Sequence, residues 1–335
     1  MMMSSDVVKK EALITVRDLV VDFRIGRRST IQAVSGISFH IGVGETLGLV
    51  GESGCGKSTI ARCIVALQRP TAGQVMFDGQ DIWQFSHRQL RTIRPQLQMI
   101  FQDAVASLNP GRRVGRTIEE PLRVFGRVDR GERTRRAHAM MAAVGLNPER
   151  MADRYPFEFS GGQCQRVSLA RALILEPSLL ICDEPVSSLD VSVQAQILNL
   201  LREMKQRFGL TMLFISHDLA VVKNISDRVA VMYLGKLCEI ASAENLYRSP
   251  RHPYTALLLA SNPEPKPAAQ GYPSEYINNV MPSPADPPRG CRFHTRCPNV
   301  QNICSKVEPK LTALYNEGQV ACHFPLERPN PTSVP

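Results

Sequence analysis

A glycine-rich segment near residue 50, GESGCGKST, constrains the fold more than any other feature of the chain. Residues 51–58 match the spacing G-x-x-x-x-G-K-[ST]. The apolar run TLGLV precedes this segment, and residues 58–67 follow it with apolar side chains at helical spacing. A buried strand, a glycine turn and a helix in this order predict a phosphate-binding loop within an α/β fold.

The chemistry of phosphate binding explains why these residue types are needed. Glycines allow successive N–H groups to turn toward phosphate oxygens, and the following helix adds free N–H groups and the positive end of its dipole. We expect Lys57 to neutralise the β- and γ-phosphates of a nucleotide and Ser58 to bind Mg²⁺. Cys55 is expected to be a small filler and not a reactive thiol. The predicted loop ligands of the nucleotide are Gly51, Glu52, Ser53, Gly54, Cys55, Gly56, Lys57, Ser58 and Thr59.

Two apolar runs far along the chain end in groups suited to hydrolysis. LLIC ends at Asp183 and Glu184, which we expect to hold Mg²⁺ through water and to activate the attacking water as a general base, respectively. LTMLFIS ends before His217, which would contact the γ-phosphate. Surface carboxylates and a structural histidine are the alternatives. The strand-end positions, in a chain with a phosphate loop, favour the catalytic interpretation.

Length and composition limit the remaining possibilities. The 335 residues, 43% of them hydrophobic, can form one large domain with an appendage or two modest domains. The chain has no apolar run of bilayer length and no signal-peptide pattern, which predicts a cytoplasmic location. The net charge of +9 would suit nucleic acid, but no aromatic-rich basic platform accompanies it. Nucleic acid is therefore not an expected partner.

Six motifs stand in the order typical of ATP-binding cassette ATPases, and the chain resembles that family over roughly residues 13–250. They are the phosphate loop, MIFQD with Gln102, FSGGQCQR, LLICDE, SSLD and FISHD. The resemblance implies an α/β fold with a P-loop NTPase cassette core over residues 1–250. It also implies an N-terminal antiparallel β region and a helical subdomain over about residues 103–170.

The resemblance further implies a mechanism that needs two cassettes. In this family two nucleotide domains close head to tail around two ATP molecules, and the signature of each completes the site of the other. Asp190 would lie at the dimer seam. The signature residues carried over to the ATP-contacting role are Ser160, Gly161, Gly162 and Gln163.

Two further roles follow from the same resemblance. Gln102 would sense the γ-phosphate and Mg²⁺ and relay their presence to a membrane partner, so the implied Mg²⁺ residues are Ser58, Gln102 and Asp183. Phe23 falls where the family has an aromatic side chain that stacks on adenine. A core phenylalanine in an N-terminal strand is the alternative for Phe23.

Several stretches, among them DEPVSSLDVS and SPRHPYTALLLAS, resemble the peptide importers of the oligopeptide and dipeptide permease group. The chain is most similar to the F-type ATPase subunit of the dipeptide permease. This implies ATP-driven uptake of di- and oligopeptides at the cytoplasmic face of the inner membrane. The implied partners are a D-type ATPase subunit, two transmembrane permease subunits and an extracytoplasmic substrate-binding protein. The alternatives are import of nickel or glutathione, an exporter, and a soluble cassette ATPase acting on ribosomes or nucleic acid.

Residues 251–290 are rich in proline and predict an extended strap. The final segment, residues 291–335, contains Cys291, Cys297, Cys304 and Cys322 at the spacing C-x5-C-x6-C-x17-C. Four thiolates could hold an iron–sulfur cluster or zinc, and small buried hydrophobic residues are the alternative. The importer group has this extension, and some members carry a [4Fe-4S] cluster in it. We expect a metal centre of this kind to staple a tail too small to fold alone.

Overall fold

The structure, a computed structural model, describes residues 11–25, 29–126, 128–261, 281–314 and 318–327. Its larger sheet has eight strands in the order β11-β12-β10-β9-β3-β8-β7-β6. The parallel strands of this sheet are β3 (Thr46–Val50), β6 (Leu97–Ile100), β7 (Leu179–Asp183), β8 (Thr211–Ser216) and β9 (Arg228–Tyr233). They are almost entirely apolar because both faces of a parallel sheet are covered.

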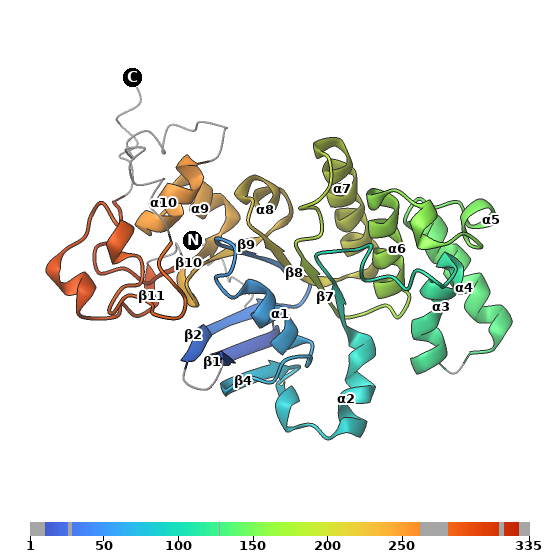
Figure 1. The fold of residues 1–335 in the computed structure, drawn as a ribbon, viewed down its shortest axis with the longest axis horizontal. Helices are drawn as coiled ribbons and strands as arrows, with labels where there is room; N and C mark the ends of the chain where they lie inside the picture. The colour runs from blue at the N-terminus through green and yellow to red at the C-terminus, as the bar shows by residue number, and fades with distance from the viewer. Residues whose placement is uncertain (1–10, 26–28, 127, 262–280, 315–317, 328–335) are drawn as a thin grey trace, which may run out of the picture.

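A second, smaller sheet is built from the N-terminal part of the chain. It has the order β2-β1-β4-β5, and its strands are antiparallel: β1 (Ala12–Ile25), β2 (Ser29–Gly42), β4 (Ala72–Phe77) and β5 (Gln80–Asp81). Helix α1 (Lys57–Ile64) contacts both sheets and closes the core between them (Figure 1). Both the predicted antiparallel β region and the predicted α/β core are therefore confirmed.

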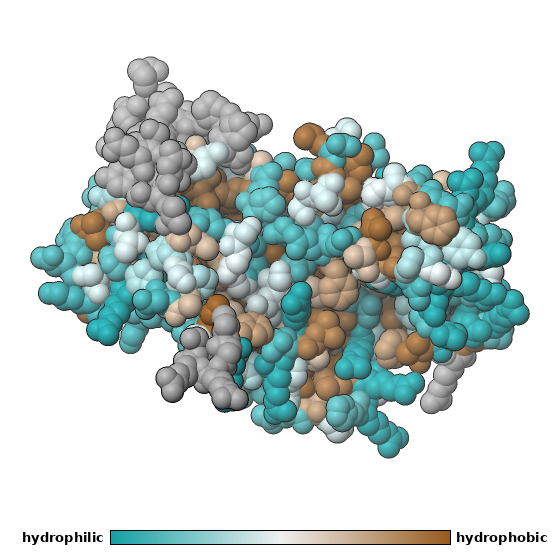
Figure 2. All heavy atoms as spheres, in the orientation of Figure 1, coloured by the Kyte–Doolittle hydropathy of each residue, from teal (hydrophilic) through white to brown (hydrophobic). Residues whose placement is uncertain are grey.

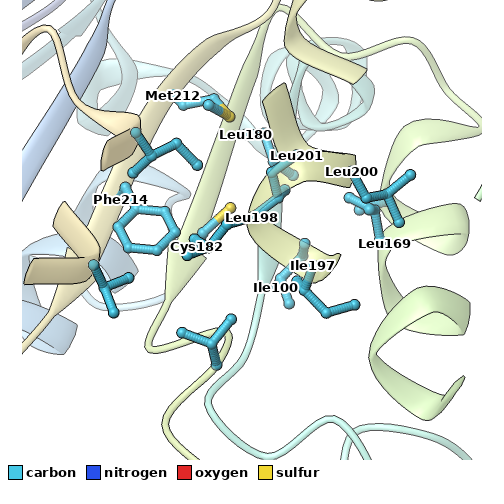
Figure 3. Close-up of a cluster of buried hydrophobic side chains, with 14 of the residues drawn as sticks. Ile100, Leu169, Leu180, Cys182, Ile197, Leu198, Leu200, Leu201, Met212 and Phe214 are labelled. Carbon is cyan, nitrogen blue, oxygen red and sulfur yellow. The ribbon is translucent and has the colours of Figure 1, made fainter. Parts of the chain in front are cut away.

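The opposite face of the larger sheet is covered by three helices, α6 (Gly161–Leu173), α7 (Val191–Phe208) and α8 (Leu219–Ile225). Figure 3 shows how β7 and β8 side chains such as Cys182 and Phe214 face Leu198 and Leu201 of α7. All four of these side chains are buried, and together with their neighbours they fix α7 on the sheet.

Helices form one end of the molecule, in the segment between Gln102 and the end of α6. They are α3 (Val114–Phe125), α4 (Arg130–Ala143) and α5 (Pro148–Met151), packed beside α6. Asp129 begins α4 by accepting a hydrogen bond from the Glu132 N–H at 2.9 Å. The short helix α2 (His87–Ile93) lies nearer the small sheet (Figure 1). Figure 2 shows that the surface over α4 is mostly hydrophilic, whereas hydrophobic residues gather near the middle of the same face.

The C-terminal extension lies at the other end of the molecule (Figure 1). After β10 (Lys236–Ser242) the chain forms α9 (Ala243–Arg248) and α10 (Pro253–Ala260), so the range expected as a strap begins with a helix. Residues 262–280 of that range lie outside the described residues. The extension then adds β11 (Thr312–Leu314) and β12 (Gly318–Val320) to the large sheet, with β12 antiparallel to β10. The tail is thus joined to the core by main-chain hydrogen bonds, which its cysteine pattern did not reveal. Within the described part of the chain, no helix combines the length and apolar character needed to cross a bilayer.

Candidate nucleotide-binding site

The phosphate loop connects β3 to α1, as its sequence predicts. Gly56 precedes α1 with φ +110°, and a Cβ there would lie 2.2 Å from the Ala33 carbonyl oxygen. A Cβ on Gly51 would lie 2.1 Å from the Met232 carbonyl oxygen. Both glycines are required because strand backbone passes directly against the loop. Lys57 is buried, and its Nζ donates to the carbonyl oxygens of Gly51 at 2.8 Å and Glu52 at 3.1 Å.

Ser58 and Asp183 come together at the end of the parallel strands. The Ser58 hydroxyl donates to Asp183 Oδ1 at 2.9 Å. Burial raises the pKa of the Asp183 carboxyl, and the hydrogen bond from Ser58 acts in the opposite direction. A hydroxyl and a carboxylate at this separation are the hard oxygen ligands that Mg²⁺ prefers.

Residues that follow three different strands lie close together around the Glu184 side chain. Gln102, after β6, donates to Glu184 Oε2 at 3.1 Å, and His217 Nδ1, after β8, lies 3.3 Å from the same oxygen. Glu184 has φ +47°, a left-handed conformation that costs about 1–3 kcal/mol in a residue with a Cβ. Its N–H donates to the Ile215 carbonyl at 3.0 Å, which helps to hold it in place. This places a fixed carboxylate, with two polar partners, at the edge where ligands bind in α/β sheets.

A cavity of about 210 Å³ joins the phosphate loop to Glu184. Gln102 also lines it, so residues from three distant segments meet around one space. Ala33 of β2 lines it too, and the sequence analysis missed it because a single small residue within a strand carries no motif. The predicted residues that line the cavity are Ser53, Gly54, Gly56, Lys57, Ser58, Thr59, Gln102 and Glu184.

The signature residues lie apart from this cavity and line none of it. Ser160 caps α6 in a reciprocal pair with Gln163: Gln163 Oε1 accepts from the Ser160 N–H at 3.0 Å, and Ser160 Oγ accepts from the Gln163 N–H at 3.4 Å. Ser160 and Gly161 are exposed, so the start of α6 is open to solvent. Asp190, which precedes α7, is also exposed.

Phe23 does not belong to the hydrophobic core. It lies on β1 opposite Ile31 of β2, and 37% of its surface is exposed. It does not line the cavity beside the phosphate loop. The alternative of a core phenylalanine is therefore wrong, and the ring is accessible to a stacking partner.

The C-terminal cysteines are brought to one place. Cys291, Cys297, Cys304 and Cys322 line a single small cavity, together with His294, His323 and Phe293. Among the described residues, no group of three or more His, Cys, Asp or Glu side chains has the arrangement of metal ligands. Burial raises the pKa of Cys297 to about 12 and that of Cys322 to about 11. These thiols are therefore protonated near neutral pH unless a cation favours the thiolate.

The five remaining cysteines pack in the interior, as expected. Cys55, within the phosphate loop, is buried, and burial raises its pKa. It is therefore a filler and not a nucleophile. The other four, Cys63, Cys164, Cys182 and Cys238, are buried as well.

Comparison with known proteins agrees with this geometry. Residues 34–187 match the ABC transporter family, and residues 238–304 match the oligopeptide/dipeptide transporter C-terminal region. The oligopeptide transport ATP-binding protein AppF of Bacillus subtilis is 49% identical over 88% of this chain and 90% of its own length. The oligopeptide transport ATP-binding protein OppF of Escherichia coli is 47% identical over 93% of this chain and 96% of its own length.

Solved structures show the same fold. The bacterial ABC transporter cassette MJ0796, in a dimer bound to ADP and phosphate, aligns with a TM-score of 0.63 and 28% identity over 69% of this chain and 98% of that protein. The cassette cbiO1 from Clostridium perfringens, part of the ABC transporter complex cbiONQ, aligns with a TM-score of 0.63 and 26% identity over 71% of this chain and 91% of that one. The predicted fold class is confirmed, and the chain belongs to the family of ABC transporter ATP-binding proteins, in its oligopeptide/dipeptide group.

Proposed function

We propose that this chain hydrolyses ATP to drive uptake of di- and oligopeptides through a membrane channel made by other chains. The observation that carries the ATPase part is the convergence of Lys57, Ser58 and Glu184 around one cavity, with Asp183 hydrogen-bonded to Ser58. The peptide cargo is supported by the relatives, which are named oligopeptide transport proteins and match this chain almost end to end.

The proposed reaction is in-line attack of water on the γ-phosphate. Ser58 and Asp183 hold Mg²⁺, which when bound neutralises charge on the phosphate oxygens. Lys57 and the loop N–H groups bind the phosphates. Glu184 accepts the proton of the attacking water, and the contacts from Gln102 and His217 orient its carboxylate.

The exposed signature supports a site shared between two cassettes. Ser160, Gly161, Gly162 and Gln163 are proposed to bind the ATP held by a partner cassette, because the start of α6 is exposed and the positive end of a helix dipole attracts an anion. Val191, next to Asp190, is 82% exposed and would lie at the seam with it. The proposed partner is a D-type ATPase subunit, and Phe23 is proposed to stack on the adenine of this chain's own ATP.

The remaining proposed partners are two transmembrane permease subunits and an extracytoplasmic substrate-binding protein, with this chain held peripherally at the inner membrane. Nickel or glutathione import would use the same machinery with other cargo. A soluble cassette ATPase acting on ribosomes or nucleic acid is the alternative of another class. The similarity of residues 238–304 to a peptide-transporter C-terminal region favours the importer.

The test is purification of the tagged chain with its partners from gently solubilised membranes, followed by reconstitution with ATP on the side of this chain. We expect two multispanning chains, a second cassette and ATP-dependent uptake of labelled di- or oligopeptides. Uptake of nickel or glutathione in place of peptide would reassign the cargo. Recovery with ribosomes or DNA, without membrane chains, would overturn the transport function.

We further propose that the extension, residues 291–335, which follows the cassette of residues 1–250, holds a [4Fe-4S] cluster. Cys291, Cys297, Cys304 and Cys322 would be its ligands, and the support is that all four line one cavity. Zinc at the same thiolates, or no metal, are the alternatives. Iron, sulfide and zinc analysis of anaerobically purified protein distinguishes them. Cys297→Ser should lower the iron content, whereas Cys63→Ser, a change in the core of the cassette, should not.

A further inference from the structure

Residues outside the motifs of the ATP site form hydrogen bonds with Glu52 of the phosphate loop. The Glu52 N–H donates to the Tyr254 hydroxyl at 3.2 Å. The Glu52 carboxylate accepts two hydrogen bonds from Arg296 Nη1, at 2.8 Å and 3.1 Å. Both the main chain and the side chain of Glu52 are therefore fixed from outside the loop.

Arg296 comes from the C-terminal extension, and its surroundings are apolar. Its side chain is 7% exposed, against 27% for Glu52. The guanidinium lies 5.7 Å from the ring centre of Tyr233 and 5.9 Å from that of Phe293. A charge that is buried beside rings and paired with a single carboxylate has a strongly preferred position.

Three rings connect the extension to the core at this point. Tyr233 lies at the end of β9, Tyr254 on α10 and Phe293 in the extension, and all three are fully or almost fully buried. Their centres are separated by 4.7 Å between the tyrosines, and Phe293 is 5.4 Å from Tyr233 and 5.2 Å from Tyr254. Aromatic contacts in this range are favourable and restrict ring rotation. The packing therefore fixes the direction in which the Tyr254 hydroxyl points.

Residues 252–254, here called the HPY segment, are oriented by one buried carboxylate. Glu239 of β10 accepts from the N–H groups of Arg251 and His252, each at 2.9 Å. His252 Nδ1 in turn accepts from the Tyr254 N–H at 3.0 Å and begins α10. This chain of bonds leads from β10 to the Tyr254 hydroxyl and so to the phosphate loop.

Main-chain hydrogen bonds hold part of the loop, since the Cys55 N–H donates to the Glu52 carbonyl at 3.3 Å and the Gly235 N–H donates to the Cys55 carbonyl at 2.9 Å. Between Gly51 and Gly56 the side chains are small, apart from Glu52. Lys57 Nζ donates to the carbonyls of Gly51 and Glu52, so any movement of Glu52 also shifts the partners of the lysine that binds the phosphates. A fixed Glu52 keeps the loop N–H groups arranged for the nucleotide before it arrives, which lowers the cost of binding.

We propose that Arg296 and Tyr254 are positioning residues for the phosphate loop, through which the C-terminal extension and the HPY segment set the affinity for ATP. The proposal rests on the nucleotide site proposed above. It gives the HPY segment and the extension a shared role in the ATPase cycle, in addition to any part in stability. Neither residue touches the nucleotide in this scheme, because both act through Glu52.

The test is steady-state ATP hydrolysis by the complete transporter with Arg296→Met, Tyr254→Phe or Lys236→Met. We expect Arg296→Met to raise KM for ATP roughly tenfold, as befits loss of a charge-assisted hydrogen bond, with kcat changed less than about twofold. Tyr254→Phe removes one hydroxyl and should raise KM by a few-fold. Lys236→Met breaks a 2.6 Å ion pair between β10 and Glu308 of the extension and is the matched control, expected to leave KM unchanged.

Two further variants and a measurement of stability distinguish positioning of the loop from general destabilisation of the fold. Arg296→Lys keeps a positive charge and should recover part of the lost affinity. The double variant combines Arg296→Met with Glu52→Gln. Its KM for ATP should be no higher than that of Arg296→Met alone, because the two changes remove the same interaction, between Arg296 and Glu52. Thermal unfolding of each variant shows whether the fold is retained.

Wild-type KM in both Arg296→Met and Tyr254→Phe, in an active transporter, would overturn the proposal. So would an equal rise in KM for Lys236→Met, since this would show that only attachment of the extension matters. An inactive wild-type complex would instead overturn the ATPase function itself.

Discussion

Ser58 Oγ lies 2.9 Å from Asp183 Oδ1, and this hydrogen bond joins two segments that are 125 residues apart in the chain. Ser58 lies in the first turn of α1, and Asp183 ends β7, which is two strands away from β3 in the sheet. The contact places a hydroxyl beside a buried carboxylate, and both are ligands of the proposed Mg²⁺ site. A change at Ser58 is therefore expected to alter the Mg²⁺ requirement of ATP hydrolysis.

Ser58→Ala should raise the Mg²⁺ concentration needed for half-maximal ATP hydrolysis by about tenfold, because one oxygen ligand is lost. Mg²⁺ titration of the ATPase activity measures this. Thr92→Ala, which removes a hydroxyl that donates to Gln89 within α2, is the control and should titrate as wild type. An unchanged Mg²⁺ requirement in Ser58→Ala would remove Ser58 from the metal site.

Glu184→Gln should lower kcat for ATP hydrolysis by about 10²–10⁴-fold, the usual contribution of a general base. ATP binding should persist, because Lys57 and the loop N–H groups are untouched, and the complex should stall in its closed state. Turnover and binding of a fluorescent ATP analogue are measured in parallel. Glu203→Gln, on an exposed position of α7, serves as the control. Near-normal turnover by Glu184→Gln would exclude it as the base.

His252 predicts a pH dependence of stability. Burial lowers its pKa from 6.5 to about 4, so the folded protein keeps the ring neutral while the unfolded chain takes up a proton below pH 6.5. The unfolded state then binds more protons, and the free energy of unfolding falls by about 3 kcal/mol as pH drops from 6.5 to 4. His252→Asn keeps a residue that can cap α10 and should weaken this dependence.

Urea unfolding at several pH values between 7.5 and 4.5 measures the effect. His87→Asn, which removes an exposed ring at the start of α2, is the control and should follow the wild-type profile. If His252→Asn loses as much stability on acidification as wild type does, the buried ring is not responsible.

The core between α7 and the sheet should be sensitive to loss of volume. Leu201 is 1% exposed, and Leu201→Ala should lower the free energy of unfolding by about 2–5 kcal/mol through lost burial and a residual cavity (Figure 3). Leu67→Ala, at a position 58% exposed, should change it by less than about 0.5 kcal/mol. Equal effects of the two changes in urea unfolding would contradict the packing described here.

Local patterns were sufficient to predict the phosphate loop, the helix after it and the strands that precede the loop, Asp183 and His217. The apolar runs before the phosphate loop and before Asp183 are buried parallel strands, because a strand covered on both faces must be apolar along its length. The polar residue after such a run lies at the carboxyl edge of the sheet, where Glu184 and His217 are in fact neighbours. Regular periodicity therefore indicates which polar residues gather at this edge of the sheet.

For the C-terminal extension, the sequence predicts the cysteine cluster but not the contacts with the core. Its cysteine spacing predicted that four thiols belong together, and they do line one cavity. The pairing of β12 with β10 was not foreseen, since three-residue strands carry almost no periodic signal. Nothing in the residues around Arg296 indicated Glu52 as its partner, 244 positions away.

The sequence by itself determined the phosphate loop, the strand-end acids and the order of the motifs, because each depends on residue types at short and regular spacing. Only the tertiary structure decided which distant groups meet. It places Ala33 beside the phosphate loop, and it brings Gln102 and His217 to the Glu184 carboxylate. It also brings Arg296 and Tyr254 to Glu52. These contacts arise from sheet order and side-chain packing between segments far apart in the chain. Such packing has no local signature, since it depends on the shape that the whole chain adopts.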